Sequence, residues 1–353
     1  MAPKCDKNGA LIATSAFLDS KVVVTGGLGF IGSNLALRLA EAGACVTIVD
    51  SAVQGCGANR HNLAATRIRL IEADIGDAAQ FKDDLRGADV IFNLAGEISH
   101  IHSMQDPARD AELNARAQLR FLEECARQTP GTRVVYASTR QIYGVPQYLP
   151  VDESHPVRPV DFNGIHKYAA TVYHELFRTI GRLDTVALCL TNVYGPRMAL
   201  NIPCQGFLGT FLRKALLGQP IEIFGEGLQL RDPVYVDDIV EAFLLAGAAP
   251  MLRSRFYNVG GFEALTVAHI AGMVSAMAGA PPPVFRPFPD ELRRIDIGSF
   301  RADSRLIRQE MGWQPQVSMN QGICESIAFY RRELEHYLDP ADAEPSCALE
   351  ARR

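Results

Sequence analysis

The chain has 353 residues and a mass of 38.6 kDa, which is enough for one large domain or two. Hydrophobic residues make up 48% of it and charged residues 21%, with a mean hydropathy of +0.02. This balance excludes a disordered chain, a collagen-like fibre and a protein with many membrane spans. The net charge of −5 comes without a basic block, so nucleic acid is not the expected partner.

Two features of the chain bear on its location. A mildly apolar run at 10–18 is short, contains hydroxyl side chains and meets Asp19 directly. We therefore expect residues 1–19 to form a flexible leader rather than a signal peptide, with no attachment to a membrane. The eight cysteines have neither disulfide-framework nor zinc-site spacing, which favours reduced thiols, a cytoplasmic protein and no bound metal.

Short β-branched runs alternate with longer amphipathic stretches up to residue 191. Strands are expected at 21–25, 44–49, 67–72, 90–94, 133–137 and 185–190. Helices are expected at 30–42, 78–85, 108–127 and 163–180. Such alternation predicts an α/β fold in which a doubly wound parallel sheet carries helices on both faces.

The pattern becomes less regular after residue 192. Short strands at 221–224, 256–259 and 284–286 mix with helices near 206–217, 236–246 and 266–278. We expect a first domain over 20–191 and a smaller mixed α/β lobe over 192–338 that mainly binds substrate; whether the two interleave is left open. Residues 339–353 show no core pattern and are expected to be a mobile tail. Ligands of such sheets bind at the carboxyl ends of the strands, so the site is expected in the cleft between the lobes.

A glycine-rich turn follows the first expected strand. The segment KVVVTGGLGFIG (21–32) has glycines at Gly26, Gly29 and Gly32, which let a pyrophosphate approach the backbone and the free N–H groups of the next helix. Asp50 ends the following strand, where an acid accepts hydrogen bonds from both hydroxyls of an adenosine ribose and repels a 2′-phosphate. This indicates NAD rather than NADP, although Arg60 further downstream argues the other way.

Further motifs follow in order along the chain. They are Asp74, NLAG (93–96), Asn114, STRQIYG (138–144), NVYGP (192–196), GEG (225–227) with Gln229 and Arg231, YVDD (235–238) and a late Leu306…Gly312-Trp313 with Pro315. Together, over about residues 20–335, they resemble the extended short-chain dehydrogenase/reductases, and more narrowly the NAD-dependent nucleotide-sugar epimerase/dehydratase family. The resemblance implies a Rossmann fold, an NAD cofactor, a nucleotide-sugar substrate and a homodimer formed by the helices at 108–127 and 163–180.

The resemblance also implies which residues bind each ligand. The expected cofactor contacts are Gly26, Gly29, Phe30, Ile31, Gly32, Asp50, Asp74, Ile75, Leu94, Ala95, Gly96, Asn114 and Lys167. The expected substrate contacts are Ser103, Arg140, Gln141, Asn192 and Arg231. Asn192 and Arg231 would hold the diphosphate; the alternative for Arg231 is a salt bridge to Asp232 or Asp237.

The expected catalytic set contains one departure from the family pattern. Members use a Ser or Thr, here Thr139, to bind the reacting sugar hydroxyl, and a Tyr-x-x-x-Lys pair whose spacing puts both side chains on one helix face. Lys167 fits the lysine, but Asn163 stands where the tyrosine would be. Asparagine does not titrate and cannot be the general base, whose loss typically costs ~10²–10⁴ in rate.

Three explanations of Asn163 are open. In the first, another group takes the proton: Tyr143, His166, Tyr168 or a water relayed through Thr139. In the second, the reaction needs no strong base at this position. In the third, the protein binds its ligands and turns over poorly. For Tyr143 the alternative is a packed aromatic of the turn. We treat Thr139, Lys167, Asn163 and Tyr143 as the candidate catalytic residues.

The two residues after Thr139 reduce the number of reaction types that the chain could catalyse. The family's 4,6-dehydratases carry Asp-Glu there and its glucuronate decarboxylases keep the Glu, whereas this chain has Arg140 and Gln141. The missing acids count against dehydration, and Arg140 either clamps a carboxylate or phosphate of the substrate or forms a surface ion pair. His100 and His102 have no acidic partner at metal spacing, which favours hydrogen bonding within a loop over ligation.

The leading hypothesis is an NAD-dependent nucleotide-sugar epimerase that inverts C4 of a hexose through a transient 4-keto intermediate. Another NAD-dependent oxidation, decarboxylation or 3- or 5-epimerisation of such substrates is the first alternative. A protein that binds NAD or a nucleotide sugar with weak or no catalysis is the second.

Overall fold

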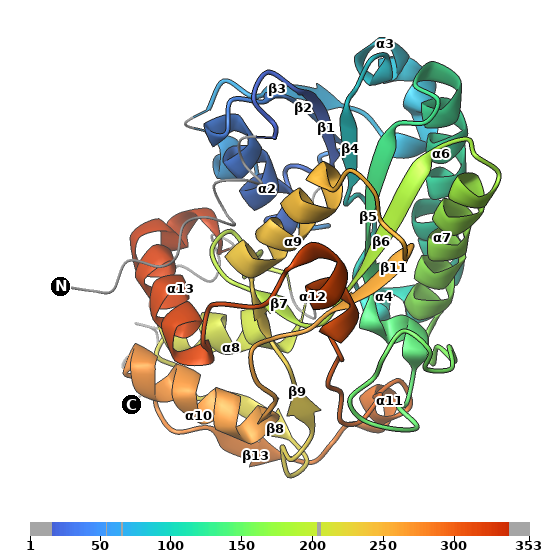
Figure 1. Ribbon diagram of the computed structural model, residues 1–353. Helices are drawn as coiled ribbons and strands as arrows, with labels where there is room; N and C mark the ends of the chain where they lie inside the picture. The colour runs from blue at the N-terminus through green and yellow to red at the C-terminus, as the bar shows by residue number, and fades with distance from the viewer. Residues whose placement is uncertain (1–15, 54, 65, 203–205, 339–353) are drawn as a thin grey trace.

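The computed structural model describes residues 16–338 except 54, 65 and 203–205, and its larger lobe is built on one seven-stranded sheet (Figure 1). The strand order is β3-β2-β1-β4-β5-β6-β11, with every pair parallel. The strands are β1 (Lys21–Thr25), β2 (Cys45–Asp50), β3 (Arg69–Glu72), β4 (Val90–Asn93), β5 (Arg133–Thr139), β6 (Asp184–Leu190) and β11 (Phe256–Val259). The doubly wound parallel sheet is confirmed, and its order reverses between β1 and β4, where such sheets bind ligands.

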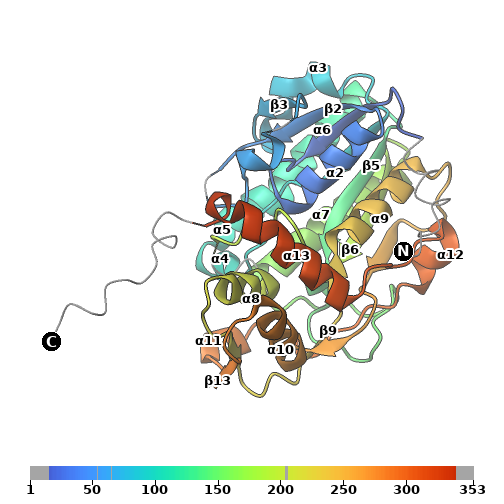
Figure 2. The ribbon, with the colours of Figure 1, turned by 90° about the vertical axis from the view of Figure 1, so that its left-hand side faces the viewer.

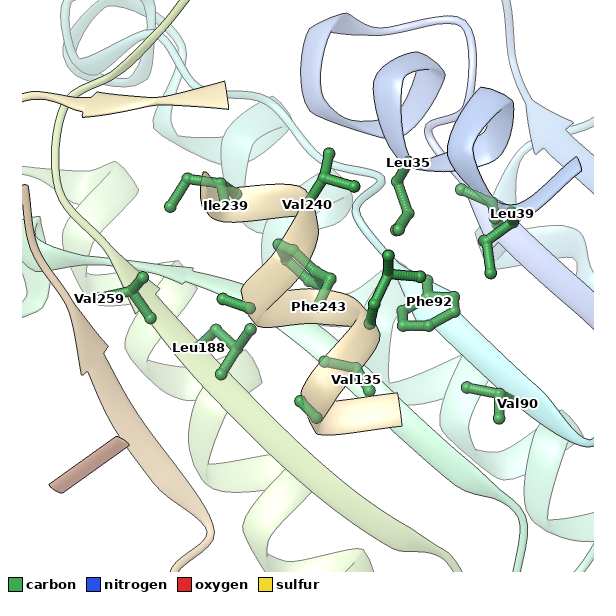
Figure 3. Packing of buried hydrophobic residues seen from close by; sticks show 14 of the residues in the cluster. Leu35, Leu39, Val90, Phe92, Val135, Leu188, Ile239, Val240, Phe243 and Val259 are labelled. Carbon is green, nitrogen blue, oxygen red and sulfur yellow. The ribbon is translucent and has the colours of Figure 1, made fainter. Parts of the chain in front are cut away.

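Helices cover both faces of the sheet because its strands are apolar on both sides. One face packs against α2 (Phe30–Glu41), α9 (Val236–Ala248) and α12 (Arg305–Met311). Figure 3 shows Phe243 and Val240 of α9 among side chains of the strands and of α2. The opposite face packs against η2 (Ile75–Phe81), α3 (Lys82–Leu85), α6 (Ala117–Gln128) and α7 (Phe162–Thr179).

The smaller lobe has its own apolar core, formed mainly by three helices (Figure 2). These helices are α8 (Phe207–Leu216), α10 (Val267–Ala278) and α13 (Met319–Glu333). Short two-stranded ladders complete the lobe: β8 (Glu222–Phe224) with β13 (Val284–Arg286), β9 (Leu230–Arg231) with β12 (Leu265–Thr266), and β7 (Val193–Tyr194) with β10 (Val234–Tyr235). The one-turn helix α11 (Asp290–Arg293) follows β13.

The C-terminal half of the chain also contributes to the larger lobe. Strand β11 pairs with β6 at the edge of the main sheet, and α9 and α12 pack on its face. A division at residue 191 therefore separates the first six strands of the sheet from the seventh.

The described residues include the last part of the expected leader. Phe17 is buried in the core, with its ring centroid 6.0 Å from that of Phe92, so the expectation of a flexible leader is wrong for residues 16–19. Residues 1–15 and the expected tail at 339–353 lie outside the described residues. Within the part of the chain that is described, no helix is long and apolar enough to cross a membrane.

Candidate functional site

A cavity of about 490 Å³ opens at the carboxyl ends of the strands and is lined by residues of both lobes. Its lining includes most of the predicted site: Gly26, Gly29, Phe30, Ile31, Gly32, Asp50, Asp74, Ile75, Leu94, Ala95, Gly96, Thr139, Arg140, Asn163, Lys167, Asn192 and Arg231. Four predicted residues do not line it: Ser103, Asn114, Gln141 and Tyr143.

The glycine-rich turn brings its backbone against the end of β4. Gly26 has φ +69°, and a Cβ there would lie 2.9 Å from the carbonyl oxygen of Leu94. A Cβ on Gly32 would overlap the carbonyl oxygen of Gly26, so this glycine lets α2 begin directly against the turn. Gly29 is the N-cap of α2 and makes no side-chain cap, which leaves the first N–H groups of the helix open to an anion.

Asp50 at the end of β2 is set up to bind two hydroxyl groups. Its Oδ2 accepts from the backbone N–H of Leu28 at 3.0 Å and its Oδ1 from that of Ala52 at 2.9 Å. Each carboxylate oxygen keeps a second acceptor site for a ribose hydroxyl. Burial raises the pKa of Asp50, while these two hydrogen bonds oppose the rise. Arg60, which argued for NADP, is exposed and paired with Glu72 instead. The turn and Asp50 therefore fit NAD.

The ends of β3 and β4 complete this half of the cavity. The Oδ1 of Asp74 accepts from the N–H of Gly76 at 2.7 Å and caps η2. Gly96 has φ +153°, and a Cβ there would lie 2.6 Å from Oδ1 of Asn114 and 2.9 Å from Nζ of Lys167. The absence of a side chain at this position therefore allows the lysine to reach the cavity wall.

A buried carboxylate on α5 (Pro107–Ala111) organises the region around Asn163. Asp110 accepts from Nδ2 of Asn163 at 3.1 Å, from Nδ2 of Asn114 at 3.0 Å, and lies 2.7 Å from Nδ1 of His166. Both amides also donate to the carbonyl oxygen of Glu97. Two acceptors thus fix the side chain of Asn163. Asn114 lies in the π-helical segment η3 (Glu112–Arg116) and does not line the cavity, so it supports the cavity wall from behind.

Lys167 is a buried amine one helical turn after Asn163. Burial lowers its pKa to about 8, against the attraction of Asp110 and Glu97, which raises it. Its Nζ also lies 5.4 Å from the centroid of the Tyr136 ring. Lys167 is therefore a cation at neutral pH that sits close to its titration range.

Thr139 is at the end of β5 and caps η4 (Arg140–Tyr143), its Oγ1 accepting from the N–H of Gln141. Gln141 turns away from the cavity and donates through Nε2 to Oδ2 of Asp161 at 2.9 Å. The prediction that Gln141 contacts substrate is therefore wrong for this geometry: the amide is buried and committed to a carboxylate.

The structure removes Tyr143 as a candidate base. Its hydroxyl is buried and donates to Oδ1 of Asn258 at 2.8 Å, within an apolar cluster outside the cavity, and burial raises the pKa of the phenol far above its ordinary value. His166 is bonded to Asp110 and Tyr168 is exposed, and neither lines the cavity. Only the water relay through Thr139 survives among the four replacements considered for the missing tyrosine.

The expected contact of Ser103 with the sugar is also wrong for this geometry. Ser103 lies in α4 (His100–Gln105), is buried, and donates from Oγ to the carbonyl oxygen of His100 at 2.8 Å. The hydroxyl thus fixes the helix that carries His100.

Arg140 and Arg231 are two of the cationic side chains that line the cavity. Arg231 is held by the carbonyl oxygens of Leu230 and Gly298 and lies 3.3 Å from Asp296, not against the two acids expected from the sequence. Burial lowers the pKa of Arg140 to about 9, with the nearby Arg231 acting in the same direction. Within the described part of the chain, Nη1 of Arg140 and Oδ1 of Asn192 have no hydrogen-bond partner. The unpartnered N–H of Arg140 is suited to an anionic ligand, whereas the amide oxygen of Asn192 is suited to a hydroxyl or N–H donor.

The polar cavity residues that sequence reasoning missed include Glu97, His100 and Arg109. Glu97 directly follows the NLAG segment, which could have identified it. His100 was considered only for metal binding and for hydrogen bonding within its loop, because its carboxylate partner, Asp161, is 61 residues away along the chain. In the structure Nδ1 of His100 and Oδ2 of Asp161 are 3.2 Å apart.

One group of side chains in the described residues could hold a metal ion, and it lies outside the cavity. His61, Glu333 and His336 have ligand atoms within 4.8 Å of one another. The two imidazole rings stack with centroids 3.6 Å apart, so their in-plane lone pairs do not converge on one point. The expectation of no metal stays a prediction.

Comparisons with known proteins agree with this geometry. The NAD dependent epimerase/dehydratase family matches residues 22–260. A UDP-glucose 4-epimerase of Mycolicibacterium smegmatis is 34% identical over 89% of this chain and 99% of its own length. The UDP-glucose 4-epimerase of Thermotoga maritima, solved with UDP-glucose, aligns with a TM-score of 0.81, 30% identity and coverage of 89% and 99%. A dTDP-glucose 4,6-dehydratase of Streptomyces venezuelae, solved with NAD bound, aligns with a TM-score of 0.80 and 26% identity. The alignment covers 90% of this chain and 99% of the dehydratase. The family model spans most of this chain, and this chain belongs to the NAD-dependent epimerase/dehydratase family.

Proposed function

We propose that this enzyme inverts the C4 hydroxyl of a nucleotide-linked hexose through a transient 4-keto intermediate. The observation that carries the proposal is one cavity that joins the dinucleotide cradle, the Thr139 and Lys167 pair, and the cationic side chain of Arg231. The similarity to two UDP-glucose 4-epimerases supports it. Those relatives make a uridine diphosphate sugar the first substrate to test.

Each cavity residue has a specific task in this scheme. When bound, NAD accepts a hydride from the carbon that carries the reacting hydroxyl and later returns it. Thr139 hydrogen-bonds that hydroxyl, and Lys167 binds the nicotinamide ribose and stabilises developing negative charge as a cation. Asn192 and Arg231 hold the diphosphate, so the sugar can turn about its phosphate link between the two hydride transfers.

The residues after Thr139 support epimerisation over dehydration. Elimination of water needs an acid for the leaving hydroxyl and a base for the neighbouring carbon. Arg140 donates only, and the amide of Gln141 is buried against Asp161. Neither position offers a group that exchanges a proton with the sugar.

A second candidate is an NAD-dependent oxidation or decarboxylation of a nucleotide-linked uronic acid. Arg140 favours it, because an arginine with an unpartnered Nη1 among the described residues is suited to a sugar carboxylate. A glucuronate-type substrate would then react where a hexose does not.

Nuclear magnetic resonance in deuterated water distinguishes these functions. UDP-, GDP- and dTDP-hexoses and the corresponding uronic acids are incubated with the purified protein. Inversion at C4 without deuterium at carbon supports the proposal, because the hydride returns directly. Deuterium at carbon indicates 3- or 5-epimerisation or dehydration, and release of CO₂ indicates decarboxylation.

The remaining alternative is a binding protein without catalysis, which Asn163 makes testable. Asn163→Tyr restores a phenol, and Asn163→Phe is the matched control because it has the same ring without the hydroxyl. A parent that turns over no nucleotide sugar, together with activity in the tyrosine variant alone, would show that the binding site has lost its base.

Homodimerisation belongs to the same proposal. One face of α7 exposes a stripe of apolar side chains at helical spacing. Contact of such a stripe with water is unfavourable, and burial in an interface would remove it from water. The stripe consists of Phe162, Ile165, Tyr168, Val172 and Leu176, with Ile180 just beyond the helix. A second copy of the chain would bury it. Sedimentation of Leu176→Glu should show a monomer, whereas Met251→Glu, at an exposed site elsewhere, should sediment like the parent. A cytoplasmic location stays a prediction.

A further inference from the structure

A histidine that lines the cavity is paired with the buried carboxylate that caps α7. His100 begins α4, lines the cavity, and its side chain is 36% exposed, whereas the side chain of Asp161 is fully buried. The Nδ1 atom of His100 lies 3.2 Å from Oδ2 of Asp161. This leaves Nε2 as the imidazole nitrogen that is not directed at the carboxylate.

Asp161 is rigidly held from its other side. Its Oδ1 accepts from the N–H of Gly164 at 2.6 Å and caps α7, and its Oδ2 accepts from Nε2 of Gln141. Burial opposes the ionisation of Asp161, but the contacts with His100, Gly164 and Gln141 hold its pKa below the ordinary value. The carboxylate is therefore ionised at neutral pH and positioned before any ligand binds.

The backbone that carries His100 is fixed as well. Ser99 caps α4 by accepting from the N–H of His102, and Ser103 donates to the carbonyl oxygen of His100. Glu97 accepts from the N–H of Ser99. These contacts leave rotation of the imidazole as the main freedom of the pair. The Nδ1 atom has no regular hydrogen bond among the described residues, and such catalytic contacts often tighten only when substrate is bound.

We propose that His100 accepts the proton of the reacting sugar hydroxyl, in place of the tyrosine that this chain lacks, and that Asp161 orients its imidazole. The inference rests on the proposed epimerase function. An anionic partner at Nδ1 keeps the proton there and leaves Nε2 free as a base. Thr139 is connected to the same pair through Gln141, whose N–H bonds Thr139 and whose amide bonds Asp161.

The transfers balance within the reaction. The carbon loses its hydride to the cofactor, the hydroxyl loses its proton to Nε2, and the C–O single bond becomes a carbonyl. The reverse transfers, with the hydride delivered to the other face of the sugar, restore the alcohol and the neutral imidazole. Lys167 is unsuited to the role below about pH 8, because it is already protonated there.

The acidic limb of the pH–rate profile is the test of this role. His100→Gln should lower kcat ~10²–10⁴-fold and remove the limb that reports a protonated imidazole. Asp161→Asn keeps a helix-capping side chain but removes the anion that orients the imidazole, so kcat should fall with little change in KM. Other charged or titratable groups face this region from α7, α5, η4 and the Glu97 loop: His166, Lys167, Arg109, Asp110, Arg140 and Glu97.

His102→Gln is the matched control, because His102 lies in the same helix, is exposed and does not line the cavity. It should retain the parent's rate and pH profile. Bound NAD, measured by absorbance after denaturation, should be equal in all variants, which excludes a simple loss of structure. In ¹⁵N spectra of histidine-labelled protein, His100 should carry its neutral-state proton on Nδ1, and Asp161→Asn should weaken that preference.

The outcomes separate this inference from the proposed function. An active parent whose His100→Gln variant keeps kcat within threefold, or whose His100 proton resides on Nε2, overturns the role of His100 and leaves the epimerase proposal standing. A parent that turns over no nucleotide sugar overturns both. Loss of rate in His100→Gln with an unchanged kcat in Asp161→Asn supports the base and overturns the positioning role of Asp161.

Discussion

Replacing Lys167 with methionine should stabilise the nucleotide-free protein while weakening its function. The amine is buried, and burial lowers its pKa from 10.5 to about 8 even though Asp110 and Glu97 favour the charge. Each factor of ten in proton affinity corresponds to about 1.36 kcal/mol, so keeping this cation in the site costs roughly 3 kcal/mol. Methionine has a similar length and no charge, and Asp110 retains its contacts with Asn114, Asn163 and His166.

The pH dependence of this gain has a definite sign. Below about pH 8 the amine is charged in both the folded and the unfolded chain, so the penalty is fully present. Between pH 8 and 10.5 the folded chain releases the proton first, and the stability of the parent rises towards that of Lys167→Met. Above 10.5 the amine is neutral in both states and the difference disappears.

Denaturant unfolding at pH 7 and at pH 10 measures this directly. Lys167→Met should exceed the parent by up to about 3 kcal/mol at pH 7, and by less at pH 10. Lys82→Met, at an exposed lysine, is the control and should show no such pH-dependent gain. A Lys167→Met protein that is no more stable at pH 7, or a gain that does not shrink with pH, would refute the reasoning.

Three further substitutions test separate parts of the site. Gly32→Ala places a Cβ on the carbonyl oxygen of Gly26, so calorimetry should detect no NAD binding to a folded protein; normal affinity would contradict the cradle. Asp50→Asn exchanges a charged acceptor for an amide, and NAD should bind about tenfold to a hundredfold more weakly, with less discrimination against NADP. Tyr143→Phe leaves Oδ1 of Asn258 without its donor, which should lower the free energy of unfolding by ~1–3 kcal/mol with kcat unchanged. A hundredfold loss of kcat in that variant would return Tyr143 to the catalytic set.

The cofactor-binding residues could be predicted from the sequence because they lie close together along the chain. The glycines of the turn and Asp50 act through backbone geometry within a single βαβ unit, and the strand pattern fixes where each lies on the sheet edge. The structure then adds the reason for each glycine, such as the approach of Lys167 and Asn114 to Gly96.

The contacts of the expected substrate-binding and catalytic residues were harder to predict from the sequence. Side-chain direction in η4 sends Gln141 to a buried carboxylate and Tyr143 into an apolar cluster, although both stand in the motif that marks the site. Arg231 forms an ion pair with Asp296, which is 65 residues away along the chain, rather than with the acids next to it in the sequence. Short-range spacing says which residues share an element but not which element each side chain meets.

The sequence by itself determined the doubly wound sheet, the position of the dinucleotide cradle and the absence of the usual tyrosine at Asn163, because periodicity and turn chemistry act over a few residues. Only the tertiary structure decided that β11 and α9 complete the first lobe, and that His100, which lines the same cavity as Thr139, meets Asp161. Those contacts join segments far apart in the chain, and their partners are selected by packing of whole elements rather than by local pattern.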